Sequence, residues 1–269
     1  MDIDLITLQL KLALREPGCP LCRLYHQAAD RYIRNLLWEH VNDGETRLHF
    51  VRSLGFCPTH AWQLQQTEIA TQGDGLGTAI LVEDLTRRIL MELETALGDM
   101  KRDTVRPSMS MWRRWWRPLR HWWEQRLARS ARTSASSGAP GLWPRGRCRV
   151  CELSQNSEAT YLEWLVRGCM QAEFQEWVRA SDGLCLAHLR RALALAGPER
   201  AQAAHFLMRI TYEKLTRLDR ELQEYIRKRA WEYRYEPKLP SEQSAWIRTV
   251  AFFAGEKPEV IGVERTPCP

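Results

Sequence analysis

Two short cysteine motifs occur twice in this chain, and they constrain its fold more than any other feature. The first half carries C-x-x-C in CPLC, followed after 34 residues by C-x-x-H in CPTH. The second half repeats this order, with C-x-x-C in CRVC and, after 33 residues, C-x-x-H in CLAH. Cysteine pairs at this spacing, combined with histidine, are typical of metal sites. We therefore expect metal binding to organise the fold.

The similarity between the two halves extends beyond these motifs. The equivalent positions are Cys19 and Cys148, Cys22 and Cys151, Cys57 and Cys185, and His60 and His188. EDLTR at residues 83–87 recurs as EKLTR at 213–217 in nearly the same register. Chance similarity between short helical segments is the alternative, but four matched metal-type residues favour an internal duplication.

The spacing within each motif predicts a helix start. Pro20 and Pro58 occupy the second position of the two motifs in the first half. Proline is favoured at the first position of a helix, because its missing N–H would have no partner there. Each motif then places one ligand at the N-cap and the other at the third helical position, where the two side chains meet. The positive end of the helix also stabilises a thiolate.

Two helix starts facing each other would supply three thiolates and one imidazole, a set that suits tetrahedral zinc. Four protein ligands leave no position open for water or substrate, so such a site is structural. We predict two zinc ions per chain, one within each repeat. The expected ligands are Cys19, Cys22, Cys57 and His60 in the first site and Cys148, Cys151, Cys185 and His188 in the second.

The second repeat lacks both prolines and has Arg149 and Leu186 in their places. We therefore expect its site to be less preorganised. Two other chemistries stay open for these residues. A Cys3His set also suits an iron–sulfur cluster, and C-x-x-C also forms thiol redox pairs. Of the other cysteines, we expect Cys169 to be a small core residue and Cys268 to lie in the tail.

Helical periodicity dominates the rest of the chain and predicts an all-α fold. Apolar residues recur at steps of three and four from Leu207 to Tyr225, and Leu81, Leu85 and Ile89 begin an equivalent stripe. A further short helix is expected between Pro240 and Gly255. The predicted divisions are a first metal-binding repeat at 1–100, a linker at 101–147, a second repeat at 148–232, and a C-terminal helix and tail at 233–269.

The linker concentrates the basic charge of the chain. It holds 12 Lys and Arg against 2 acidic residues, a net charge of +10, whereas the whole chain has +6. A basic amphipathic helix with aromatic residues is predicted within it, and its key residues are Trp112, Arg113, Arg114, Trp115, Trp116, Trp122 and Trp123. The tryptophans either cover the core of the repeats or bind an anionic membrane surface, nucleic acid or an acidic protein.

The sequence shows no local motif of a known enzyme class. A P-loop, G-x-G-x-x-G and H-E-x-x-H are all missing from it. Glu39 and Asp43 lie one helical turn apart and would suit acid–base work, although a solvated helix face explains them better. The first charged residues are acidic, and polar residues interrupt the apolar ones, so the N-terminal segment does not resemble a secretory signal. No apolar run approaches the length of a membrane span. We expect a cytoplasmic protein, with a peripheral membrane protein as the alternative.

The segments CPLCRL, LLWEHVND, GFCPTHAWQL and AWIRTVAFFAG resemble a bacterial and archaeal family of unknown function, whose members carry paired CPLC…GFCxxH motifs. The resemblance implies the fold and the metal sites but no reaction. The sequence therefore favours a non-enzymatic, zinc-binding helical scaffold or adaptor with an unknown protein partner. An iron–sulfur or thiol redox protein, and a membrane-surface or nucleic-acid binder acting through the linker, are the alternatives.

Overall fold

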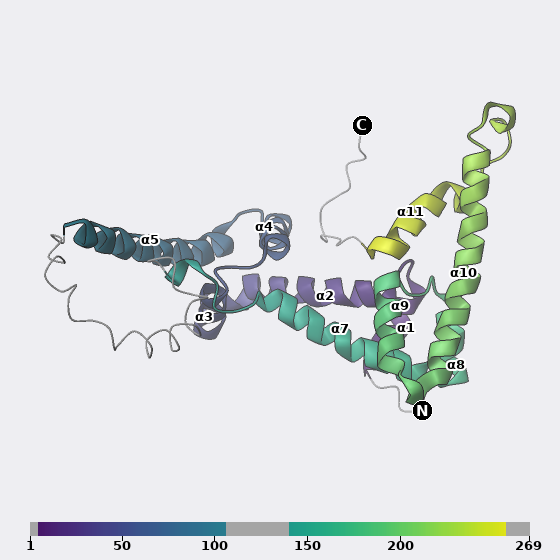
Figure 1. The fold of residues 1–269 in the computed structure, drawn as a ribbon, viewed down its shortest axis with the longest axis horizontal. Helices are drawn as coiled ribbons and strands as arrows, with labels where there is room; N and C mark the ends of the chain where they lie inside the picture. Colours follow the sequence, from purple (N-terminus) through teal and green to yellow (C-terminus); the bar gives the residue numbers. More distant parts are fainter. Residues whose placement is uncertain (1–4, 106–139, 257–269) are drawn as a thin grey trace, which may run out of the picture. The chain divides into compact units, whose positions relative to one another are not determined.

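The computed structural model describes residues 5–105 and 140–256 (Figure 1). Helices and turns make up these two ranges, and they contain no strand, so the predicted all-α class is confirmed. Residues 106–139, which hold the seven Trp and Arg residues named for the linker, and Cys268 lie outside the described ranges. No helix within those ranges is both long enough and apolar enough to cross a membrane.

The chain divides into two compact units. Unit 1 combines residues 1–35 with residues 150–269, and unit 2 comprises residues 36–149. These units differ from the divisions expected from the sequence, because the first C-x-x-C motif belongs to the same unit as most of the second half. The internal duplication itself stays a prediction.

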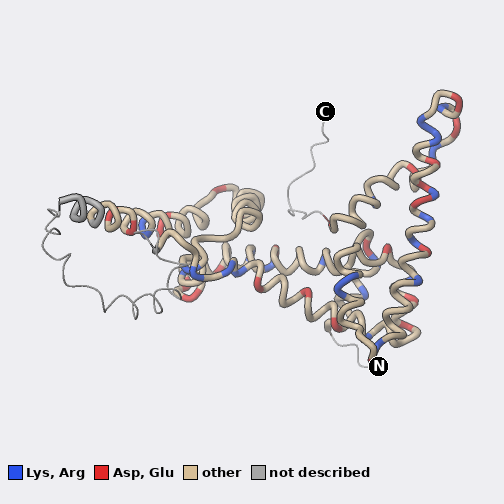
Figure 2. The backbone as a smooth tube through the Cα atoms, in the orientation of Figure 1, with Lys and Arg blue, Asp and Glu red and all other residues tan. Residues whose placement is uncertain are grey.

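Within the described residues, unit 1 is built from seven α-helices and two 3-10 turns. They are α1 (Leu5–Arg15), α2 (Pro20–Asn35), α7 (Arg149–Gly168), α8 (Ala172–Ala180), α9 (Leu186–Ala196), the 3-10 turn η3 (Pro198–Arg200), α10 (Ala201–Arg227), the 3-10 turn η4 (Trp231–Tyr233) and α11 (Pro240–Ala254). One apolar cluster joins most of them, and Leu21, Leu165 and Leu207 are fully buried in it. The stripe beginning at Leu207 is confirmed as a helix, and basic and acidic residues alternate along the rest of α10 (Figure 2).

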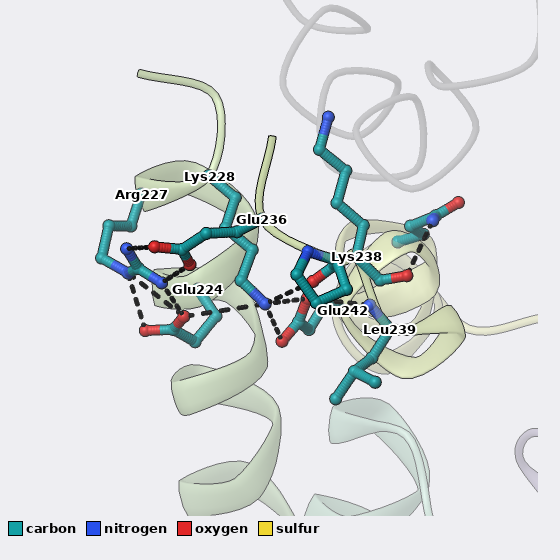
Figure 3. Close-up of polar contacts among 9 residues, drawn as sticks. Glu224, Arg227, Lys228, Glu236, Lys238, Leu239 and Glu242 are labelled. Atoms are coloured by element: carbon teal, nitrogen blue, oxygen red, sulfur yellow. Dashed lines mark hydrogen bonds and ion pairs between the residues drawn. The ribbon is translucent and has the colours of Figure 1, made fainter. Parts of the chain in front are cut away.

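A buried ion pair fixes the connection from α10 to α11 (Figure 3). Lys228 Nζ lies 2.8 Å from both carboxylate oxygens of Glu242 and also donates to Pro237 O at 3.0 Å. Glu242 in turn accepts the Leu239 N–H at 3.0 Å, which satisfies a free donor at the start of α11. Residues 240–255 thus form the predicted helix and its glycine end, with Gly255 at φ 81°.

Unit 2 contains the π-helix η1 (Leu36–His40), α3 (Gly44–Arg52), α4 (Pro58–Gln72), α5 (Leu76–Val105) and the 3-10 turn η2 (Pro140–Leu142). Its buried apolar residues include Leu36, Phe50, Leu64 and Leu81. Buried Glu68 accepts the N–H groups of Gly77 and Thr78 at 2.6 and 2.9 Å. This carboxylate caps the start of α5 and positions it against α4.

Candidate metal centres

The structure gathers the eight predicted ligands into two groups, each with three cysteines and one histidine. The first cluster comprises Cys19, Cys22, Cys185 and His188, and the second cluster comprises Cys57, His60, Cys148 and Cys151. Within each cluster the ligand atoms all lie within 4.8 Å of one another. Each group can hold a metal ion, so the sequence identified the convergent residues.

The expected grouping within each repeat was wrong. A C-x-x-C motif from one half meets the C-x-x-H motif from the other half in both clusters. The physical reason is packing: α2 and α9 contribute to one apolar core in unit 1, whereas the CPTH motif at residues 57–60 lies in unit 2. Both arrangements give three thiols and one imidazole, so ligand chemistry alone cannot choose between them.

The first cluster is built on two helix starts, as predicted. Cys19 directly precedes α2, and Cys22 lies in the first turn of that helix. Cys185 is the N-cap of α9, with φ −67° and ψ 163°, and His188 is the third residue of that helix. All four side chains are buried. The N-terminal ends of both helices therefore direct their dipoles and free N–H groups toward the sulfur atoms.

The spacing in the first cluster approaches that of ligands around a tetrahedral metal. His188 Nδ1 lies 3.4 Å from Cys19 Sγ, 3.4 Å from Cys22 Sγ and 3.1 Å from Cys185 Sγ, and the sulfurs of Cys22 and Cys185 are 3.7 Å apart. Zinc bond lengths and tetrahedral angles imply about 3.6 Å for sulfur to nitrogen and about 3.8 Å for sulfur to sulfur. A disulfide would need a much shorter S–S distance of about 2.05 Å.

A buried carboxylate orients the histidine of the first cluster. His188 Nε2 lies 2.5 Å from Glu158 Oε1 on α7, and Arg191 donates to the same oxygen. Because Nε2–H donates to Glu158, Nδ1 is the nitrogen that faces the three sulfurs, and it can bind a metal once its proton is displaced. Metal-binding histidines usually donate their second ring N–H to a carboxylate in this way. Burial raises the pKa of Glu158, but hydrogen bonds from His188 and Arg191 lower it more, which favours the ionised form.

Protons are distributed unequally over the four ligands. Hydrogen bonds with Cys19 and Cys22 lower the pKa of the Cys185 thiol, whereas hydrogen bonds with Cys185 and Cys22 raise the pKa of the Cys19 thiol. Burial lowers the pKa of His188, but hydrogen bonds to Cys185 and Cys22 raise it to about 11. A metal ion must displace these protons to reach the thiolates and the imidazole, so metal binding releases protons.

The end of α11 closes over the first cluster. The Cys19 N–H donates to Glu256 Oε1 at 3.2 Å, and His26 Nε2 donates to Glu256 O at 3.0 Å. A Cβ on Gly255 would lie only 3.3 Å from Cys22 Sγ, and the φ of 81° at this glycine is disfavoured for other residues. Glycine at position 255 therefore lets the chain approach the sulfur closely.

The second cluster uses the start of α4 and the start of α7. Cys57 is the N-cap of α4, with φ −62° and ψ 161°, and Pro58 follows at the first helical position as predicted. His60 Nδ1 lies 3.2 Å from Cys57 Sγ and 3.6 Å from Cys148 Sγ. His60 and Cys148 are buried, whereas Cys57 and Cys151 are half-buried. This cluster is therefore more open to solvent than the first.

The prolines do not distinguish the two clusters. The first contains Pro20 and the second Pro58, because each cluster takes one motif from each half. The backbone angles at Cys185, which precedes a leucine, nearly equal those at Cys57, which precedes a proline. A proline-free site therefore does not form, and the two clusters differ in burial instead.

Three further residues that the sequence singled out lie outside both clusters. Cys169 is fully buried in the core of unit 1, as expected, and burial raises the pKa of its thiol to about 12. Asp43 caps α3 by accepting the Thr46 N–H at 2.8 Å, which lowers the pKa of Asp43. Asp43 thus serves as a helix cap, whereas Glu39 is exposed beside His40.

The sequence did not point to Glu158 or Glu256, although both contact the first cluster. At the offset of 129 residues, the counterpart of Glu158 is Ala29, so the repeat gave no signal for a carboxylate there. Glu256 lies 237 residues from Cys19, beyond the reach of any local pattern.

Comparison with known proteins places the chain in a family. The family model described as "Family of unknown function (DUF6062)" matches residues 1–260. The chain belongs to DUF6062. This membership confirms the resemblance to a family of unknown function that the cysteine motifs indicate.

A curated protein is similar to this chain over a shorter stretch. The "Uncharacterized 23.9 kDa protein in xynA 3'region" of Caldicellulosiruptor sp. (strain Rt8B.4) is 37% identical to this DUF6062 chain over 73 residues. The match covers 27% of this chain and 33% of that protein, so the chain spans about a third of the relative's length. No solved structure matches the chain.

Proposed function

We propose that each cluster binds one zinc ion and that the chain is a non-enzymatic helical scaffold whose helix junctions these ions hold together. The observation that carries the proposal is the convergence of three sulfurs and one Nδ1 at two facing helix starts, with the imidazole of the first cluster oriented by Glu158. Zinc prefers such a tetrahedral set of nitrogen and sulfur ligands.

The number of ligands supports a structural role over a catalytic one. Catalytic zinc sites generally use three protein ligands and keep a fourth position for water or substrate. Each cluster here offers four ligand atoms, so a tetrahedral ion would have no open position. The ion would then contribute to folding and to the placement of the surrounding helices.

Metal analysis with a visible absorption spectrum tests this proposal. The full-length chain would be purified without oxygen, and its zinc, iron and other transition metals would be measured together with its thiols. We expect two zinc ions per chain and no colour. Iron with a brown absorbance would favour the iron–sulfur alternative, and a chain without metal would leave only thiols.

Single substitutions assign each ion to its cluster. Cys185→Ser should remove one zinc ion from the first cluster, and Cys57→Ser should remove one from the second. Cys169→Ala is the matched control, because Cys169 is buried but lies outside both clusters, and it should keep two ions. Loss of both ions from either ligand variant, with the fold intact by circular dichroism, would contradict two independent sites.

A further inference from the structure

A cavity adjoins the first cluster within unit 1. Its volume is about 580 Å³, which lies inside the range of about 300–1,000 Å³ typical of small-molecule sites. Its walls come from the end of α1, the start of α2, the loop between α8 and α9, the middle of α10 and the last turns of α11. Cys19 and Cys185 both line it, so the cavity lies directly against the backbone that carries two metal ligands.

Two glycines shape the wall that faces the cluster. Gly18 and Gly183 have φ of 91° and 89°, which favours glycine at both positions. A Cβ on Gly18 would come within 2.2 Å of Glu256 Oε1, and a Cβ on Gly183 within 3.2 Å of Lys214 Cδ. These glycines allow Glu256 and Lys214 to lie against the loops that hold Cys19 and Cys185.

Basic side chains outnumber acidic ones in this cavity. Five Lys or Arg residues and three Asp or Glu residues line it, which gives a net charge of +2. Two of the carboxylates already accept backbone N–H groups: Asp182 from Gly18 at 2.8 Å and Glu256 from Cys19 at 3.2 Å. Two of the three carboxylates thus already accept hydrogen bonds from the protein itself.

Several basic groups keep unused hydrogen-bond donors. Lys214 Nζ donates to the carbonyl oxygens of Arg179 and Ser181, so one of its three N–H donors has no partner among the described residues. Arg217 forms neither a hydrogen bond nor an ion pair with the part of the chain that the structure describes. Arg23 donates one terminal N–H to Pro17 O, and its Nε is buried without a hydrogen-bond partner.

Apolar side chains of α10 and α11 also line the cavity. Leu215 and Leu218 of α10 face the cavity together with Ile247 and Phe252 of α11. These side chains can cover a hydrocarbon body, while Lys214 and Arg217, on the same turns of α10 as the two leucines, can reach an acidic group. A site with apolar walls and a few convergent polar groups is the usual form of a small-molecule pocket.

We propose that this cavity binds a small organic anion, with one acidic group held by Lys214 and Arg217 and an apolar body against α10 and α11. Carboxylates and phosphates share the required chemistry, since both form charge-assisted hydrogen bonds with Lys and Arg. Binding there would contact the loops of Cys19 and Cys185, so the ligand would sit beside the first cluster without coordinating its metal.

Isothermal titration calorimetry of the full-length, metal-analysed protein tests this inference. Octanoate carries a carboxylate and octyl phosphate carries a phosphate, each on a similar alkyl chain. Octan-1-ol has the alkyl chain without a charge, and inorganic phosphate has the charge without an alkyl chain. We expect one octyl anion to bind per chain, at least about tenfold more tightly than octan-1-ol or inorganic phosphate.

Substitutions that reverse or remove a positive charge then locate the site on α10. Arg217→Glu and Lys214→Met should each weaken binding of the octyl anion by about tenfold or more. Arg220→Glu is the matched control, because Arg220 is exposed on the same helix and does not line the cavity, and it should leave binding unchanged.

Three results would overturn the inference: neither octyl anion binds, octan-1-ol binds as tightly as the anions, or Arg217→Glu binds like the unmodified chain. Zinc content is measured on the same samples. If the chain binds an octyl anion but contains no zinc, only the proposed structural zinc ions are contradicted. If the chain holds its full zinc content but binds no octyl anion, only the inferred ligand site is contradicted.

Discussion

At the scale of single residues, the pairing of His188 with Glu158 decides which nitrogen meets the sulfurs. Both side chains are buried, and the carboxylate also accepts a hydrogen bond from Arg191. A charged acceptor fixes the ring more firmly than a neutral one and makes the opposite nitrogen a better ligand. Glu158 would therefore act on a metal bound at the first cluster through His188.

This role predicts the effect of Glu158→Gln. The amide keeps an acceptor for the His188 N–H but loses the negative charge, so we expect zinc affinity at the first cluster to fall by about 10–100-fold. Competition with a zinc-binding dye measures that affinity. Glu163→Gln is the control, since Glu163 is partly exposed on the same helix and pairs only with Arg167 among the residues described. Equal affinities in the two variants would show that Glu158 does not tune the site.

At the scale of elements, helix starts were predictable and their partners were not. Pro58 after Cys57 indicated a helix beginning at residue 58, and α4 begins there. The spacing of leucines after Leu207 likewise predicted α10. The choice between Cys57 and Cys185 as the partner of Cys22 depends on which helices share a core, and that requires long-range packing. A one-dimensional repeat favours pairing within each half, which the structure contradicts.

Burial at the helix starts predicts the order of metal loss. Cys57 and Cys151 of the second cluster are half-buried, whereas every ligand of the first cluster is buried. A chelator and water reach an exposed ligand sooner, so we expect the second cluster to release its metal first. Graded chelation followed by iodoacetamide labelling and peptide mass spectrometry would follow each cysteine separately.

The labelling experiment contains its own control. Burial raises the pKa of Cys169 to about 12, so roughly one molecule in 10⁴ carries this thiolate at pH 8. Cys169 should stay unlabelled while Cys57, Cys148 and Cys151 react, and it should react once the chain is denatured. Simultaneous labelling of Cys19 and Cys57 would contradict an ordered release, and early labelling of Cys169 would indicate global unfolding instead.

At the scale of the whole molecule, each cluster joins distant parts of the chain. The sulfurs of Cys22 and Cys185 are separated by 163 residues in sequence, and Cys148 and His60 by 88. A metal that binds only where folding brings these distant ligands together stabilises the folded state. The helices of unit 1 also share an extensive apolar core, so they do not depend on metal alone.

Removal of metal should therefore lower the melting temperature while leaving helices in place at room temperature. Each zinc ion at a thousand times its Kd contributes about 4.1 kcal/mol. At about 2–4 °C per kcal/mol for a chain of this size, chelation should lower Tm by about 8–16 °C for each ion removed. Circular dichroism melts with and without chelator measure this shift. A Cys57→Ser, Cys185→Ser double variant should melt early and show no response to chelator. Coincident melts of the zinc-loaded and chelated protein would mean that the ions add nothing to the stability of the fold.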